Sequence, residues 1–195
     1  MSEAKDSDTK CRIIAAAEKL FRDIGYQKTT VADIARALTM SPANVYRFFH
    51  SKREINETVA LRLIGEVEAA CDEIVSGPGS AETRLRAVIR AVHEMSARRY
   101  VDDVKIHEMV RAALTESWPI IEGYIARMND RVAGLIAEGV ASGEFRDVDP
   151  VMTAACLNAA SLRFTHPGLM MECARMEQPS LAAMLDFLMS ALRKP

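Results

Sequence analysis

The feature that most constrains the fold of this chain is the recurrence of apolar residues every three or four positions. Near the N-terminus, Ile13, Ala17, Leu20 and Ile24 form one such stripe, which is the pattern of a helix with one buried face. No window shows sustained alternation of apolar and polar residues, the pattern of a half-buried strand. Residue types that lose little on entering a helix outnumber Val and Ile. The sequence therefore predicts an all-α protein.

Capping residues mark where the predicted helices begin and end. A first helix extends from about residue 8 to a C-terminal cap at Gly25. Thr30 with Asp33 forms a capping box that opens a second helix, and Ser41 followed by Pro42 opens a short third one. Ser51-Lys52-Arg53-Glu54 is another capping box and begins a longer helix. By the same signals, helices are expected over about 51–75, 82–99, 104–114, 118–141, 149–162 and from 180 onward.

The spacing of these helices divides the chain. Three short helices with brief breaks lie within the first fifty residues, and the run Ser76-Gly77-Pro78-Gly79-Ser80 is a linker. We therefore expect a small domain over residues 1–50, a connecting helix over 51–75, and a helical domain over 76–195.

Composition excludes several classes of protein. The chain has 195 residues, of which 49% are apolar and 27% charged, with a net charge of −2, so it is neither disordered nor collagen-like. The longest stretch without charge is residues 150–162, which is too short for a membrane span. Four widely spread cysteines indicate neither a zinc ribbon nor a disulfide framework. A cytoplasmic protein with reduced thiols and no membrane partner is expected.

Residues 30–49 have the spacing of a helix-turn-helix, in which the second helix enters the major groove of DNA. Asn and Arg side chains can hydrogen-bond to base edges, and Pro and Ala can contact a thymine methyl group. The inward positions Val45, Phe48 and Phe49 alternate with polar ones. The residues predicted to face DNA are Ser41, Pro42, Ala43, Asn44, Tyr46 and Arg47.

Charge supports this interpretation locally. Between Lys28 and Arg53 the only acidic residue is Asp33, and five basic residues give the segment a net charge of +4. The rest of the chain is acidic on balance, so the positive patch coincides with the predicted DNA-reading unit.

The stretch IIAAAEKLFRDIGYQKTTVADIARALTMSPANVYRFFHSKREI, from Ile13 to Ile55, resembles the N-terminal domain of the TetR/AcrR family of bacterial repressors. The resemblance covers about a quarter of the chain. It implies a homodimer that binds a palindromic operator and is released when a small molecule enters the C-terminal domain. Control of efflux genes is common among such repressors. The family often has glycine at the turn position occupied here by Thr39.

The resemblance also assigns roles to single residues. Thr30 and Lys52 correspond to positions that contact DNA phosphates, and Tyr46 to a tyrosine that contacts the DNA backbone. The positions where the family reads bases are occupied by Pro42, Ala43, Asn44 and Arg47.

The C-terminal half is rich in methionine, a flexible side chain that suits an adaptable apolar cavity. We expect an effector pocket among the middle helices, with His93, His107 or His166 as polar groups. The alternative is that most of these methionines belong to the core or to a dimer interface. The predicted pocket residues are Met95, Met109, Trp118, Tyr124, Met128, Phe164 and His166.

The last two helices predict a dimer interface. Small residues such as Ala155 and Ala159 permit close approach of helices, and an apolar stripe follows Ser180. Two helices from each chain would form a four-helix bundle, and in the resembling family the last two helices play this part. Packing within one chain is the alternative. The interface residues are predicted to be Ala155, Ala159, Leu181, Met184, Leu185, Leu188 and Leu192.

An enzyme is the competing class of function. A di-iron helical bundle needs paired E-x-x-H motifs, and no His in this sequence has a Glu three residues before it. Motifs of metalloproteases, α/β-hydrolases and phosphate-binding loops are absent too. No two histidines are spaced as ligands on one helix face, so neither a metal nor a cofactor is expected. A DNA-binding regulator that responds to oligomerisation or to protein partners, without a small-molecule effector, stays open as an alternative.

Overall fold

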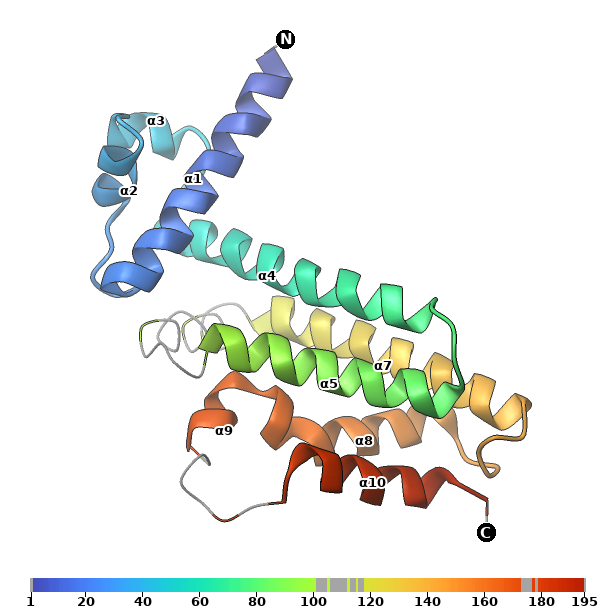
Figure 1. Cartoon of the computed structure of the whole chain (residues 1–195). Helices are drawn as coiled ribbons and strands as arrows, with labels where there is room; N and C mark the ends of the chain where they lie inside the picture. Colours follow the sequence, from blue (N-terminus) through green and yellow to red (C-terminus); the bar gives the residue numbers. More distant parts are fainter. Residues whose placement is uncertain are drawn as a thin grey trace. The chain divides into compact units, whose positions relative to one another are not determined.

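The computed structural model describes residues 2–100, 118–172 and 179–194, together with positions 105, 112, 115 and 177. Within these ranges all named elements are helices, as predicted (Figure 1). Contacts divide the chain into a first unit, residues 1–64 and 103–121, and a second unit, residues 65–102 and 122–195. The division crosses two helices: α4 (Lys52–Val75) between residues 64 and 65, and α7 (Trp118–Ala141) between residues 121 and 122.

Among the described residues, the first unit contains three complete helices, the beginning of α4 and the first residues of α7. Their bounds are α1 (Ser2–Ile24), α2 (Val31–Ala37), α3 (Pro42–Tyr46) and α4 (Lys52–Val75). Helix α1 begins six residues earlier than predicted. Fully buried side chains from all four helices, including Ile13, Ile34, Val45 and Ile55, form the core of this unit.

The caps predicted from the sequence form, with one difference. Thr30 and Asp33 make the reciprocal capping box at α2, and the Ser41 hydroxyl accepts from the Asn44 amide at α3. At α4 the Ser51 hydroxyl accepts from the amide of Glu54, but the Glu54 carboxylate accepts from the amide of His50 instead of that of Ser51.

The turn after α2 is a Schellman motif that contains a strained residue. The Met40 amide donates to the Ala35 carbonyl at 2.9 Å and the Thr39 amide to the Arg36 carbonyl at 3.1 Å. This geometry places Thr39 at φ 56°, in the left-handed region, where the Cβ of an L-residue is crowded. The position is one where glycine would fit without strain.

The second unit is a helical bundle. Besides the C-terminal part of α4, it contains α5 (Ala81–Tyr100), most of α7 (Trp118–Ala141), α8 (Pro150–Thr165), α9 (Pro167–Glu172) and α10 (Leu181–Leu192). Helices α5, α8 and α10 pack against one another, and α9 packs against α5 and α8 (Figure 1). Most of the predicted helix 104–114 lies outside the described residues.

One hydrophobic core joins these helices. It includes Cys71 of α4, Leu85 of α5, Leu135 of α7, Leu157 of α8 and Met189 of α10. Because residues from both ends of the unit meet here, the bundle closes only when α10 is in place. No helix among the described residues has the length and apolar character needed to cross a bilayer.

Candidate nucleic-acid interface

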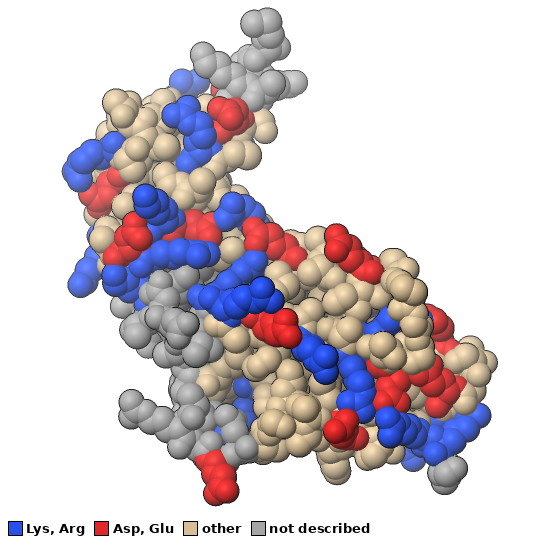
Figure 2. Space-filling view, viewed as in Figure 1, with Lys and Arg blue, Asp and Glu red and all other residues tan. Residues whose placement is uncertain are grey.

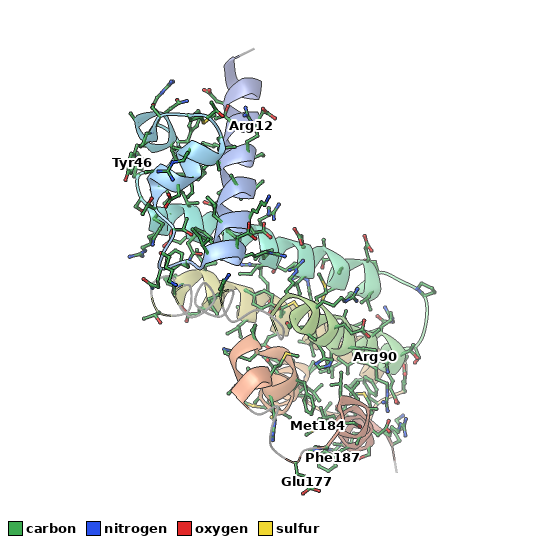
Figure 3. The ribbon with its side chains drawn as sticks, turned by 60° about the vertical axis from the view of Figure 1, so that its left-hand side comes forward. Arg12, Tyr46, Arg90, Glu177, Met184 and Phe187 are labelled. Carbon is green, nitrogen blue, oxygen red and sulfur yellow. The ribbon has the colours of Figure 1, made fainter. Side chains whose placement is uncertain are left out.

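Helix α3 has a buried side and an exposed side, as a recognition helix requires. Val45 is fully buried and Phe49, just after the helix, is 4% exposed. The opposite side consists of the predicted DNA-facing residues: Ser41, Pro42, Ala43, Tyr46 and Arg47 are exposed, and Asn44 is half-buried. Tyr46 points away from the unit (Figure 3). The inward residues thus fix α3 to the core and leave the predicted contact residues accessible.

Arg47 and Asn44 lie beside each other on this exposed side. An Arg47 guanidinium nitrogen lies 3.5 Å from Asn44 Oδ1, the outer limit of a hydrogen bond. The Arg47 guanidinium also lies 5.9 Å from the centre of the Phe48 ring. Neither contact is buried, so both side chains can exchange these weak interactions for hydrogen bonds to base edges.

Thr30 is exposed at the N-terminal end of α2, and its hydroxyl is engaged in the capping box. This hydroxyl donates to Asp33 Oδ2 at 2.6 Å and accepts from the Asp33 amide at 3.1 Å. The hydrogen bonds from Thr30, aided by Arg36, hold the pKa of Asp33 below its usual value. The Asp33 carboxylate therefore stays ionised near neutral pH and keeps the start of α2 in one conformation.

Lys52 has a structural role that sequence reasoning missed. Its ammonium donates to the backbone carbonyl of Tyr26 at 2.9 Å and to that of Gln27 at 3.4 Å. It also lies 4.4 Å from the centre of the Tyr26 ring, a cation–π distance. Lys52 thereby fixes the loop between α1 and α2 to the start of α4. No local pattern could have found this contact, because its partners lie about 25 residues earlier in the chain.

The exposed charge of the first unit is mixed. Separate basic and acidic side chains lie among uncharged ones on its visible face (Figure 2). Arg36 pairs with Asp33 at 2.9 Å and Arg53 with Glu57 at 2.9 Å. Exposed pairs of this kind contribute little to stability, so these arginines remain available to a polyanion.

The predicted effector-pocket residues are only partly brought together. Phe164 is buried, and His93 packs against it with ring centres 6.4 Å apart. His93 Nδ1 lies 2.8 Å from the Phe164 carbonyl. Because a carbonyl only accepts, Nδ1 is the donor in this hydrogen bond.

The other predicted pocket residues are more scattered. Met95 and Tyr124 are half-buried, and Met128 packs against the hydrophobic core. His166 Nδ1 accepts from the Leu169 amide at 3.3 Å. Met109, His107 and the side chain of Trp118 lie outside the described residues. Among the described residues, no cluster of His, Cys, Asp and Glu is arranged to bind a metal.

The predicted dimer interface needs correction at α10. Leu185, Leu188 and Leu192 are 0%, 7% and 2% exposed, so they are core residues of the chain itself. Leu181 and Met184 are half-buried. The apolar stripe of α10 faces α5 and α8, because those helices cover it, and it is not a free surface.

A different apolar surface is exposed beside it, which we call the α8–α10 surface. On α8, Ala155 and Ala159, which were predicted to lie in the dimer interface, are exposed. Large apolar side chains accompany them: Val151 is 73% exposed, Met152 65%, Leu162 41% and Phe187 of α10 69%. Phe187 points away from the bundle (Figure 3). A signal for Val151, Met152 and Phe187 was present in the sequence, since each is an apolar residue off the core stripe of its helix.

Comparison with known proteins gives two family matches. Residues 13–59 match the family described as "Bacterial regulatory proteins, tetR family". Residues 81–184, more than half of the chain, match "Tetracyclin repressor-like, C-terminal domain". The HTH-type transcriptional regulator YhgD of Bacillus subtilis is 25% identical over 153 residues, which are 75% of this chain and 77% of YhgD.

Solved structures share the fold over nearly the whole length. A TetR/AcrR-family regulator from Thermobifida fusca matches with a TM-score of 0.72 and 24% identity, covering 96% of this chain and 100% of its own. A regulator from Saccharomonospora viridis, solved in complex with choline, matches with a TM-score of 0.70 and 21% identity, covering 97% and 100%.

Proposed function

Because the chain belongs to the TetR family of bacterial transcriptional regulators, we propose that it represses its target genes by binding a palindromic operator as a homodimer. A small apolar or amphipathic effector releases it from the operator. It is a DNA-binding regulator and not an enzyme. The genes that it controls encode efflux functions.

The exposed side of α3 carries the proposal. Asn44 and Arg47 offer hydrogen bonds to base edges, while Pro42 and Ala43 offer apolar contacts to thymine methyl groups. Tyr46, 48% exposed, contacts the DNA backbone. Thr30 and Lys52 contact phosphates at the ends of α2 and α4, and Lys52 does so in addition to its contacts with the loop after α1.

The homodimer forms through the α8–α10 surface. Four large apolar side chains of α8 and α10 are exposed there, and exposed apolar patches mark protein–protein contacts. The small residues Ala155 and Ala159 let the α8 helices of two copies approach closely. A dimer would place two recognition helices about one turn of DNA apart, roughly 34–36 Å.

The effector binds in the second unit, beside His93 and Phe164. The buried ring of Phe164 beside the imidazole of His93 is the mixture of apolar and polar groups that small-molecule sites present. The choline bound to the S. viridis regulator supports a small-molecule effector for a protein of this fold. The effector binds more tightly to the conformation that does not bind DNA. The ratio of its affinities for the two conformations sets how far it can shift the equilibrium between the DNA-binding and the non-binding conformation.

Fluorescence anisotropy with DNA from upstream of the protein's own gene tests the proposal. The wild type should prefer this DNA over a scrambled duplex by about 10³-fold or more. Arg47→Ala should weaken specific binding by about tenfold and leave binding to scrambled DNA nearly unchanged. Arg98→Ala, which removes an exposed charge from α5, is the matched control. Equal losses on both duplexes with Arg47→Ala would refute a base-reading role for Arg47.

A further inference from the structure

The first unit contains a hollow between α1 and α4, which we call the α1–α4 hollow. It is lined by Ala15, Glu18, Lys19 and Arg22 of α1 and by Arg62 of α4. Among the described residues, none from α2 or α3 lines it, so a molecule bound there leaves the predicted base-reading residues uncovered. The hollow has a volume of about 300 Å³ and is open to solvent, which is enough room for a small molecule.

A buried carboxylate lies in the wall of this hollow. Within the described part of the chain, Glu18 is the only charged residue that is buried, at 8% exposed. Its carboxylate accepts a hydrogen bond from Arg22 at 2.7 Å and forms an ion pair with Arg62. Because one arginine from each helix contacts the same carboxylate, Glu18 holds both guanidinium groups at the hollow.

The two arginines keep most of their hydrogen-bonding capacity. A guanidinium group has five N–H donors, and the contact with Glu18 uses one nitrogen of each arginine. The side chains of Arg22 and Arg62 are 41% and 46% exposed, so their other donors are accessible to a ligand. Such groups, already fixed in position, lose less freedom when a ligand binds than mobile side chains do.

The charge of the hollow is not balanced by the residues that line it. Lys19, which is exposed, adds a third positive charge to those of the two arginines. Glu18 is the one acidic residue in the lining, so the net charge is +2. Asp23, the next acidic residue along α1, does not line the hollow. A ligand with two negative charges would therefore complement it.

We propose that the α1–α4 hollow binds the phosphoryl group of a small phosphorylated molecule. A phosphate monoester has a charge of about −1.5 to −2 at pH 7, close to the charge that the hollow lacks. Its oxygens accept paired hydrogen bonds from guanidinium groups. Because the hollow is open, the rest of the molecule extends into solvent. This site lies in the first unit and is separate from the proposed effector site, so the inference goes beyond the proposed function.

DNA phosphates offer the same oxygens but fit the hollow less well. Each phosphate of the DNA backbone has a single negative charge, whereas the lining has a net charge of +2. The residues proposed to contact DNA, on α2, α3 and the start of α4, are also absent from the lining. A free phosphate monoester is therefore the favoured ligand, and the experiment below separates the two sources.

Isothermal titration calorimetry of the full chain with phenyl phosphate tests the proposal. At pH 8 this probe is a dianion, and phenyl sulfate is a monoanion of similar shape that serves as the matched ligand control. We expect phenyl phosphate to bind with a dissociation constant of about 1 mM or lower, as for a small ligand in an open site. Phenyl sulfate should bind at least about fivefold more weakly, because it lacks the second charge.

Variants of the lining should weaken phenyl phosphate binding in a defined order. Arg22→Gln and Arg62→Gln each leave one arginine on Glu18 and should each weaken binding by about tenfold, the effect of losing charge-assisted hydrogen bonds. Arg62→Lys keeps the charge without the planar group, so its affinity should lie between those of Arg62→Gln and the wild type. Lys19→Gln alters an exposed side chain and should weaken binding by about threefold.

Arg12→Gln is the matched control, because Arg12 is an exposed cation of α1 that does not line the hollow (Figure 3). It should bind phenyl phosphate like the wild type. Circular dichroism spectra show whether each variant keeps its helices. Equal phenyl phosphate affinity in the wild type, Lys19→Gln and the two arginine-to-glutamine variants would overturn the proposal, as would an absence of binding to the wild type.

Fluorescence anisotropy with a scrambled duplex distinguishes the source of the phosphate. We expect Arg22→Gln and Arg62→Gln to bind this duplex like the wild type. If they lost duplex binding but kept phenyl phosphate binding, the hollow would contact DNA and the proposal would be wrong. Failure of the wild type to prefer its upstream DNA over the scrambled duplex would count against the proposed function alone, since phenyl phosphate binding is measured without DNA.

Discussion

Backbone strain in this chain is clearest at a single residue, Thr39. Its left-handed backbone is required by the Schellman motif that ends α2, because the amides of Thr39 and Met40 must reach back to the carbonyls of Arg36 and Ala35. A β-branched side chain is a poor choice there. The turn forms nonetheless, since α2 and α3 are both packed into the core on either side of it.

Thr39→Gly should therefore raise the free energy of unfolding. We expect a gain of about 0.5–1 kcal/mol, the difference between the left-handed strain and the extra backbone entropy of glycine. Chemical denaturation followed by circular dichroism measures it. Thr39→Ala keeps a Cβ and with it most of the strain, so it should gain less. A glycine variant less stable than the wild type would show that the Thr39 side chain makes a compensating contact.

Gly139 shows the opposite case, in which the absence of a side chain is required. A Cβ at this position would overlap the ring of Phe145, which is 1% exposed in the core. Gly139→Ala should therefore destabilise the protein by about 1–3 kcal/mol through overpacking.

Gly134→Ala, on the same helix with open space around it, should stabilise the protein by up to about 1 kcal/mol. Thermal unfolding of the two variants side by side gives the comparison. If Gly139→Ala and Gly134→Ala changed stability in the same direction, the result would contradict the close packing of the Phe145 ring against Gly139.

At the scale of elements, α5 is capped by a residue from far along the chain. The Glu144 carboxylate accepts hydrogen bonds from the amides of Ala81 and Glu82, at 2.8 and 2.9 Å. Partial burial acts to raise the pKa of Glu144, but hydrogen bonds from Glu82, Ser80 and Ala81 outweigh it and hold the pKa below its usual value. The carboxylate thus connects the loop after α7 to the first turn of α5.

This cap makes stability depend on pH in a defined direction. Because the pKa of Glu144 is lower in the folded protein, its contribution is fully present above the unfolded pKa of about 4.3 and is lost as the pH falls through the folded pKa. Glu144→Gln should lower stability at pH 7 by about 1 kcal/mol, the cost of losing a helix cap.

The difference between Glu144→Gln and the wild type should shrink as the pH approaches 3. Urea denaturation at a series of pH values records it, with Glu73→Gln at an exposed position of α4 as the control for loss of charge. A difference that stayed constant down to pH 3 would mean that the ionised carboxylate is not what caps α5.

A second network connects α5 to the end of the chain. Glu82 accepts from Arg193 at 2.6 and 2.9 Å and from Arg86 at 2.9 Å, and Arg86 also donates to Asp186 of α10 at 2.7 Å. The hydrogen bond from Arg193, assisted by Arg86, lowers the pKa of Glu82. Acid therefore weakens the attachment of α10 to α5 as the pH falls through the lowered pKa of Glu82.

For the whole molecule, the α8–α10 surface determines the proposed assembly. Met152→Glu combined with Phe187→Glu places two charges on this apolar surface, and a charge buried without a partner is costly. The dimer dissociation constant should rise by about 30-fold or more, as for a residue at the centre of an interface. Sedimentation velocity over a concentration series measures it.

Leu61→Glu is the matched control, because Leu61 is an exposed apolar residue, at 47%, on the part of α4 in the first unit. That variant should associate like the wild type. If the double variant also associated normally, the chain would dimerise through another surface.

The sequence predicted local structure well and contacts between distant residues poorly. Thr30, Ser41, Asp149 and Ser180 all cap the helices that they were expected to begin, because a cap depends only on residues three positions away. The stripe through Leu185 was assigned to a dimer because an apolar stripe shows that a face is buried without showing what buries it. Lys52 and Glu144 contact atoms 26 and 63 residues away, beyond any periodic pattern.

The position of Arg193 also bears on how the protein is made. Its partner Glu82 is 111 residues earlier in the chain, and Leu188, Met189 and Leu192 complete a core that begins at Cys71. On the ribosome, α5 is therefore synthesised long before the helix that covers it. Its apolar face depends on temporary protection while residues 101–192 are still being added. A premature stop codon at position 185 would remove Leu188, Met189 and Leu192 and leave that face without the helix that covers it.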